Sequence, residues 1–173
     1  MKNGFKKVAP DEQKIIGEII GDIGVCMLTT ISHLGGLHSR PMYAQEIDEE
    51  GSLWFFTSSS SNLMEEINKI PVVNATFSAF GKGKFLSATA LAYEAFDQKK
   101  MKELWTPALE VWFKDGIDTP DITLLRLDLQ EIEYWDSPSS SLVKVAGLVS
   151  DSLSSISLIK SFSVTIFFSD VCY

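Results

Sequence analysis

The sequence predicts one mainly β domain, a small antiparallel barrel of six strands with flanking helices. Three observations lead to this expectation. Six segments have the composition of strands, helical spacing of apolar residues is confined to short segments, and Gly-rich turns such as residues 33–36 and 81–83 join neighbouring strand segments. We expect the domain to span residues 1–150, with residues 151–173 forming a C-terminal tail of uncertain structure.

The first elements follow from local patterns. A helix is predicted to begin at Asp11, which can cap it, and to end at Gly24. Its apolar residues recur at helical spacing: Ile15, Ile16, Ile19, Ile20 and Ile23. Strands are then predicted over residues 25–31, 37–47 and 53–57, because apolar runs alternate with turn residues. Three consecutive antiparallel strands are therefore expected.

Residues 62–149 also alternate between segments with helical spacing and segments with the composition of strands. The elements expected here are a helix over 62–70, strands over 72–80 and 84–96, a helix over 97–104, a strand from 122 to 129 that extends toward Trp135, and a helix over 139–149. Pro71 stops the first of these helices because proline cannot continue a helix. The last 22 residues mix serine with apolar residues in no clear period and predict no element.

Composition excludes several classes of protein. The net charge of −8 and the absence of a basic run argue against a nucleic-acid binder. Cys26 and Cys172 lie far apart, which favours a reduced, cytoplasmic compartment. The basic start is followed by Pro10 instead of an apolar run, so we expect no secretory signal, and no apolar stretch is long enough for a membrane span.

One pair of segments has the chemistry of a cofactor site. His38, Arg40 and Met42 alternate along a predicted strand and so share one face, and residues 57–62 form a hydroxyl-rich turn before a helix. An Arg and exposed backbone N–H groups together suit a phosphate, which predicts a nucleotide-like cofactor. Two plainer interpretations remain open: Arg40 as a surface cation, and the serines as a solvated loop with an N-cap.

Six short motifs occur in a characteristic order. They are Met-Leu-Thr-Thr, His-Ser-Arg-Pro-Met, Leu-Trp-Phe-Phe-Thr-Ser, Gly-Lys-Gly-Lys-Phe-Leu-Ser, Glu-Leu-Trp-Thr-Pro-Ala-Leu-Glu-Val-Trp-Phe and Glu-Tyr-Trp-Asp-Ser-Pro. Over residues 12–149, this order resembles the general stress protein branch of the pyridoxamine phosphate oxidase-like, FMN-binding split barrels. The resemblance implies a split-barrel homodimer that holds FMN at the subunit interface and acts as an oxidoreductase or flavin carrier, with a role in stress.

The resemblance also assigns site residues, though no catalytic side chain. It places Arg40, Pro41 and Met42 against the flavin, and Thr57, Ser58 and Ser61 at the ring edge or the phosphate. It makes Trp112 and Trp135 candidates to wall the flavin or an unidentified small-molecule substrate. No acid–base pair is required, because a bound flavin performs the electron transfer.

The sequence departs from the family pattern at the expected phosphate site. Relatives usually place Lys at the position of Leu63, and the oxidases proper carry Arg at the position of Asn62. Each lost charge-assisted contact costs roughly 1.5–3 kcal/mol if nothing compensates. Lys82 and Lys84 are candidates to compensate, but hairpin geometry is the simpler explanation of the Gly-Lys-Gly-Lys segment. Ala90 also replaces a Gly that many relatives have, and its methyl group narrows the space for backbone approach.

Other functions remain to be weighed against flavin binding. One alternative is a non-catalytic dimeric binding module that has lost the flavin, and another is a split barrel that uses a deazaflavin or haem. A metal site is not expected, because the only histidines, His33 and His38, lack neighbouring ligand motifs. A Ser-His-Asp hydrolase is rejected because no Gly-x-Ser-x-Gly motif occurs.

Overall fold

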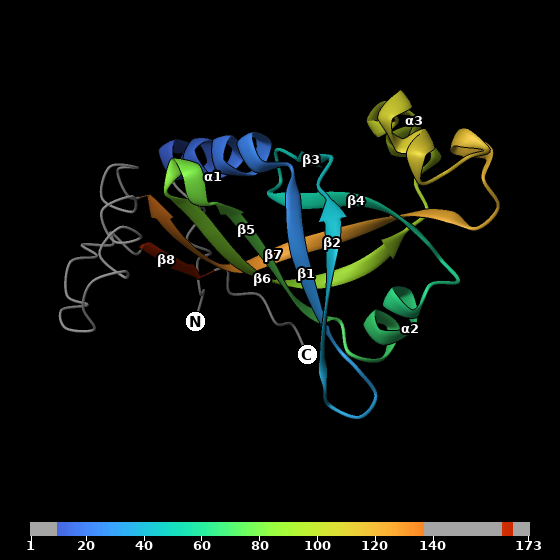
Figure 1. Cartoon of the computed structure of the whole chain (residues 1–173), viewed down its shortest axis with the longest axis horizontal. Helices are drawn as coiled ribbons and strands as arrows, with labels where there is room; N and C mark the ends of the chain where they lie inside the picture. Colours follow the sequence, from blue (N-terminus) through green and yellow to red (C-terminus); the bar gives the residue numbers. More distant parts are fainter. Residues whose placement is uncertain (1–9, 137–163, 168–173) are drawn as a thin grey trace, which may run out of the picture.

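A computed structural model describes residues 10–136 and 164–167 (Figure 1). Within these ranges the chain is mainly β, as predicted, and every strand pairing is antiparallel. The elements are α1 (Pro10–Ile23), β1 (Val25–Ile31), β2 (Leu37–Tyr43), β3 (Glu46–Ile47), β4 (Ser52–Ser58), α2 (Asn62–Lys69), β5 (Val72–Ala79), β6 (Lys84–Ala95), α3 (Gln98–Leu104), β7 (Ile122–Asp136) and β8 (Val164–Phe167), with short 3₁₀ turns at Phe80–Lys82, Pro107–Val111 and Gly116–Asp118.

The sheet curls because its two terminal strands, β2 and β3, are joined by only two residues. The strand order is β2-β1-β5-β6-β7-β4-β3, with β8 added beside β7. A flat sheet would separate β2 from β3 by roughly 29 Å, whereas the chain from Tyr43 to Glu46 spans at most about 11 Å. Ala44 N donates to Gly24 O (2.8 Å) and Gln45 N donates to Trp54 O (2.9 Å), so this short link connects the two ends. The sheet therefore wraps into a half-barrel (Figure 1).

This closure corrects two predictions. The strand expected over 37–47 is interrupted at Ala44 and Gln45, because the chain crosses there from one end of the sheet to the other. The expected run of three consecutive paired strands is also wrong, since β4 pairs with β7 and β3 and not with β2. The described residues contain eight strands instead of six, because of this interruption and of β8. β8 falls in the tail, and the helix expected over 139–149 lies outside the described residues.

The core fills the concave side of the sheet. Alternate residues of β1, β5 and β6 point inward and meet α1 and α2, which both lie against the sheet (Figure 1). The main cluster includes Ile16, Ile19, Ile20, Leu28, Phe55, Leu63, Met64, Ile67, Phe77 and Leu86. Ala90 is fully buried in this cluster, at a shift of register between β6 and β7. The helical spacing of the α1 isoleucines therefore predicts the buried face correctly.

Strand β4 is buried on both faces, which explains its unbroken apolar run. Leu53 and Phe55 belong to the main core, while Trp54 and Phe56 belong to a second cluster with Leu104, Leu109 and Leu124. This second cluster holds α3 and the Pro107–Val111 turn against the end of β4. The same arrangement places the start of α2 beside an aromatic surface. None of the helices in the described ranges has the length and apolar character needed to cross a membrane.

Candidate functional site

The predicted hydroxyl-rich turn and part of β2 line one cleft of about 480 Å³, which we call the aromatic cleft. Its lining residues are Val25, Pro41, Met42, Tyr43, Gln45, Phe56, Thr57, Ser58, Ser61, Leu109, Trp112 and Phe113. Six of the eight site residues expected from the sequence are among them. Tyr43 packs its ring 3.2 Å from the position that a Cβ on Gly24 would take, and Gly24 has a φ of +71°. A glycine is therefore required where α1 turns into β1 behind the cleft.

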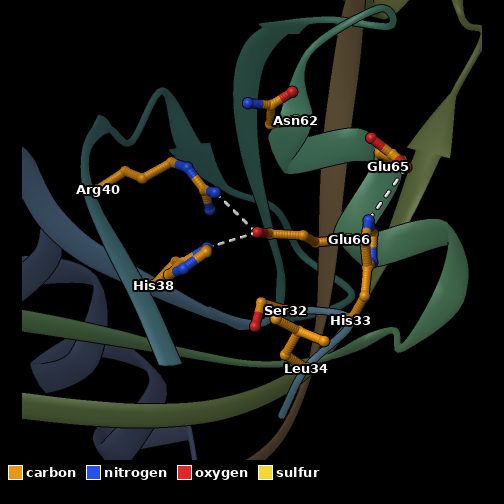
Figure 2. A pocket seen from close by; sticks show the side chains of 8 residues that line it. All are labelled: Ser32, His33, Leu34, His38, Arg40, Asn62, Glu65 and Glu66. Carbon is orange, nitrogen blue, oxygen red and sulfur yellow. Dashed lines mark hydrogen bonds and ion pairs between the residues drawn. The ribbon is translucent and has the colours of Figure 1, made fainter. Parts of the chain in front are cut away.

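Arg40 lines a second, neighbouring cleft of about 370 Å³, which we call the Glu66 cleft (Figure 2). It is lined by Ser32, His33, Leu34, His38, Arg40, Asn62, Glu65 and Glu66. The consecutive residues Arg40 and Pro41 divide between the two clefts, as do Ser61 and Asn62. The clefts therefore adjoin at β2 and the start of α2. Arg40 and the 57–61 turn therefore line different clefts.

Glu66 organises the second cleft and was not predicted from the sequence. It lies on α2, with its side chain 7% exposed, and its Oε2 accepts hydrogen bonds from Arg40 Nη2 (2.7 Å) and Thr30 Oγ1 (2.6 Å). His38 Nδ1 lies 2.6 Å from Oε1 of Glu66 (Figure 2). Arg40 also donates from Nη1 to Thr30 Oγ1 (2.7 Å). Thr30 and His38 are opposite one another in the β1–β2 ladder, so the strand register brings these groups to Glu66.

The carboxyl group of Glu66 is ionised across the ordinary pH range. Its burial raises the pKa, but hydrogen bonds from Thr30, Arg40 and His38 and the positive charge of Arg40 outweigh that effect and hold the pKa at about 2, compared with an ordinary 4.5. The Nδ1–H of His38 therefore donates a hydrogen bond to the carboxylate. The positive charge of Arg40 is therefore paired with the carboxylate of Glu66.

The lowered pKa of Glu66 predicts a defined pH dependence of stability. Because the folded pKa lies below the unfolded one, the stabilisation is complete above about pH 4.5 and is lost as the pH falls toward 2. We expect the difference in the free energy of unfolding between wild type and Glu66→Gln to shrink over that window and to stay constant from pH 6 to 8. Denaturant unfolding at several pH values measures it. A difference that grows on acidification would contradict the assignment.

Asp121 supports the hydroxyl-rich turn and was not predicted as a site residue from the sequence. Its carboxylate accepts hydrogen bonds from Ser58 Oγ (2.6 Å) and from Ser60 Oγ, and its carbonyl oxygen accepts from Ser59 N (2.8 Å). The hydrogen bonds from the two serines hold the pKa of Asp121 below its ordinary value. Asp121 has a φ of +61°, a conformation that Asp tolerates better than most residues. The hydroxyls of Ser58 and Ser60 are therefore already engaged, and Ser61 Oγ accepts from Met64 N as the N-cap of α2.

Aromatic residues form the wall of the first cleft. Phe56 packs edge-on against Trp105 and Phe113, with ring centroids 5.5 Å and 6.3 Å apart. Trp112 is different, because it is 65% exposed. Trp135 sits opposite Phe85 in the β6–β7 ladder and lines neither of the two clefts. The structure therefore brings Trp112, but not Trp135, together with the other expected residues.

The ion pairs of Lys82, Lys84 and the two histidines lie outside the aromatic cleft. The ammonium groups of Lys82 and Lys84 lie 3.3 Å and 3.7 Å from Asp22 on α1, and neither residue lines either cleft. His33 contacts Glu65 and Lys69, whereas His38 contacts Glu66, so the histidines do not form a pair. No group of three or more potential metal ligands occurs in the described ranges.

Comparisons with known proteins agree on one family. The profile of the family described as "Pyridoxamine 5'-phosphate oxidase like" matches residues 11–155. No curated protein matches the chain. A solved structure assigned to the general stress family, from Xanthomonas campestris pv. campestris, is 30% identical, with a TM-score of 0.63, and the match covers 76% of this chain and 91% of that one.

Two other solved structures extend the comparison. The "general stress FMN/FAD binding protein" of Xanthomonas citri is 28% identical with a TM-score of 0.63, and the match covers 74% of this chain and 90% of that one. A protein of Clostridium acetobutylicum, described as related to general stress protein 26 and to the pyridoxinephosphate oxidase family, is 21% identical with a TM-score of 0.65. That match covers 75% of this chain and 91% of the other. At this identity it shows a shared fold only.

Proposed function

Because the chain belongs to the pyridoxamine 5′-phosphate oxidase-like family, we propose that it is a flavoprotein that holds the ring of FMN in the aromatic cleft. The observation that carries this proposal is the collection of Pro41, Met42, Thr57, Ser58 and Trp112 around that one cleft. The FMN/FAD-binding relative from Xanthomonas citri supports the choice of ligand.

The cleft fits the flavin ring. Its volume of about 480 Å³ lies in the range of small-molecule sites, and Met42, Phe56 and Phe113 offer a polarizable and aromatic surface. Thr57 contributes a hydroxyl at the same wall. The cleft offers no cation for the phosphate, because no Lys or Arg is among its lining residues in the part of the chain that the structure describes. The fit is therefore to the ring and not to the phosphate.

In such a site the flavin and the protein have separate roles. When bound, the flavin supplies the electron-transfer chemistry. Phe56, Trp112 and Phe113 would hold the ring by aromatic contact, and the hydroxyl of Thr57 would serve its polar atoms. These roles suit an oxidoreductase or a flavin carrier in the cytoplasm, with a part in the stress response. The competing function is a non-catalytic dimeric module with an empty cleft.

We also propose that the protein is a homodimer. The outer face of β1, β2 and β5 exposes an apolar surface that includes Val25 (45%), Met27 (44%), Leu37, Tyr43 and Val72. Val25 lies opposite Tyr43 in the β1–β2 ladder, and Met27 lies opposite Pro41, so Val25, Met27, Pro41 and Tyr43 form one contiguous group. Val25, Pro41 and Tyr43 also line the aromatic cleft. A second copy that covers this surface would therefore complete one side of the cleft.

Titration with FMN tests the proposed function, and Trp112 offers the sharpest variant. Trp112→Ala is expected to weaken FMN binding roughly tenfold, because it removes an aromatic contact with the ring. Val111→Ala is the matched control, since Val111 is 75% exposed and is not among the residues that line the cleft. Visible absorbance and quenching of tryptophan fluorescence report the binding. No binding at high micromolar FMN would favour the non-catalytic module.

A further inference from the structure

We propose that this protein recognises a flavin through its ring and not through its phosphate, so that riboflavin binds about as tightly as FMN. The inference rests on the proposed function and names the ligand class of the same cleft. Its evidence is the state of three groups beside the two clefts: Arg40, the start of α2, and Asp121, which binds the cleft-lining Ser58.

The charge of Arg40 is already paired. Its two terminal nitrogens donate to Glu66 and Thr30 at 2.7 Å each, and its side chain is only 27% exposed. Arg40 also lines the Glu66 cleft and not the aromatic one. It is the only Lys or Arg among the lining residues of the two clefts in the described ranges. A phosphate would have to compete with the buried carboxylate of Glu66 for this guanidinium.

The start of α2 supplies no replacement charge. Asn62 is neutral and exposed, and it lines the Glu66 cleft. Leu63 is 4% exposed and packs in the main core, so the residue at this position contributes to stability and not to ligand binding. Asn62 and Leu63 thus leave the first turn of the helix without a cationic side chain.

Negative groups lie beside both clefts. The carboxylate of Asp121 holds the hydroxyls of Ser58 and Ser60, so these donors are not free for a phosphate. Glu65 and Glu66 project from the first two turns of α2 into the neighbouring cleft (Figure 2). A phosphate dianion placed here would meet like charges, which oppose its binding. The ring, by contrast, meets the apolar wall of Met42, Phe56 and Phe113, and this contact is identical for riboflavin and FMN.

The test compares riboflavin with FMN on the purified full chain, by fluorescence titration. A phosphate held by a charge-assisted contact would favour FMN roughly ten- to hundredfold. We expect the two dissociation constants to agree within about threefold, and the FMN constant to change little between low and high salt. FMN binding tenfold tighter than riboflavin would overturn this inference and leave the proposed function standing. Failure of both flavins to bind would refute the proposed function itself.

A gain-of-function variant locates the phosphate. Asn62→Arg adds a cation at an exposed position beside the N-cap, so it is expected to tighten FMN binding roughly tenfold and to leave riboflavin binding unchanged. Asn62→Gln is the matched control and should change neither constant. An Asn62→Arg variant that binds both flavins with wild-type affinity would overturn the placement of the phosphate at the start of α2, and the explanation with it.

Discussion

Replacing Glu66 with alanine is expected to lower the free energy of unfolding by roughly 2–4 kcal/mol at pH 7. The variant removes the common acceptor of Thr30, Arg40 and His38 and leaves the guanidinium of Arg40 next to the core without a counter-ion. Breaking a fully buried pair costs roughly 3–5 kcal/mol. The lower range applies here because Arg40 and His38 still reach water.

The neighbouring glutamate provides a matched control. Glu65 lies on the same turn of α2 but is 57% exposed, and it pairs with Lys69 and His33 at the surface. Glu65→Ala should change the free energy of unfolding by less than about 1 kcal/mol, because exposed ion pairs contribute little. Denaturant unfolding of the two variants measures the contrast. Equal losses in Glu66→Ala and Glu65→Ala would contradict the larger contribution to stability that we assign to Glu66.

A double-mutant cycle separates the pair from its parts. If Glu66 and Arg40 stabilise the fold through each other, the loss in Glu66→Ala/Arg40→Ala should be smaller than the sum of the two single losses by more than about 1 kcal/mol. The reason is that removing both partners leaves no unpaired charge beside the core. Additive losses would assign the stability to the separate side chains instead.

The fold was predictable where local patterns decide it. The five α1 isoleucines, the Gly turns and the apolar run of β4 each specify an element, and the structure contains those elements near the expected bounds. The order of strands was not predictable in this way, because the closing of the half-barrel depends on Ala44 and Gln45. Nothing in the composition of these two residues distinguishes a crossing between sheet ends from a continuing strand.

The site residues were likewise predictable where they lie in short motifs and not where their partners are distant in sequence. Pro41, Met42 and the 57–61 turn were identified because each lies in a short motif. Glu66 and Asp121 were missed because their partners are distant in sequence: Arg40 is 26 residues from Glu66, and Ser58 is 63 residues from Asp121. Both carboxylates change the interpretation of neighbours that had been identified, since they engage the cation and the hydroxyls expected to hold a phosphate.

Met27→Glu is expected to give a monomer and, as a consequence, to weaken flavin binding more than tenfold. Met27 is 44% exposed on the outer face of β1, so the variant should fold normally in isolation. A charge desolvated at the centre of an apolar interface costs several kcal/mol, which corresponds to roughly a hundredfold or more in the dimer dissociation constant. Light scattering during size-exclusion chromatography measures the mass, and titration with FMN measures the affinity.

Phe96→Glu is the control, because Phe96 is 84% exposed and lies after β6, away from the proposed interface strands. It should leave both mass and affinity unchanged. Met27 is more informative than Val25 or Tyr43, since it is not among the residues that line the aromatic cleft. A loss of flavin affinity that accompanies loss of the dimer in Met27→Glu would support a cleft that is completed across the interface. A monomeric variant that binds FMN as tightly as wild type would instead show that one chain holds the flavin alone.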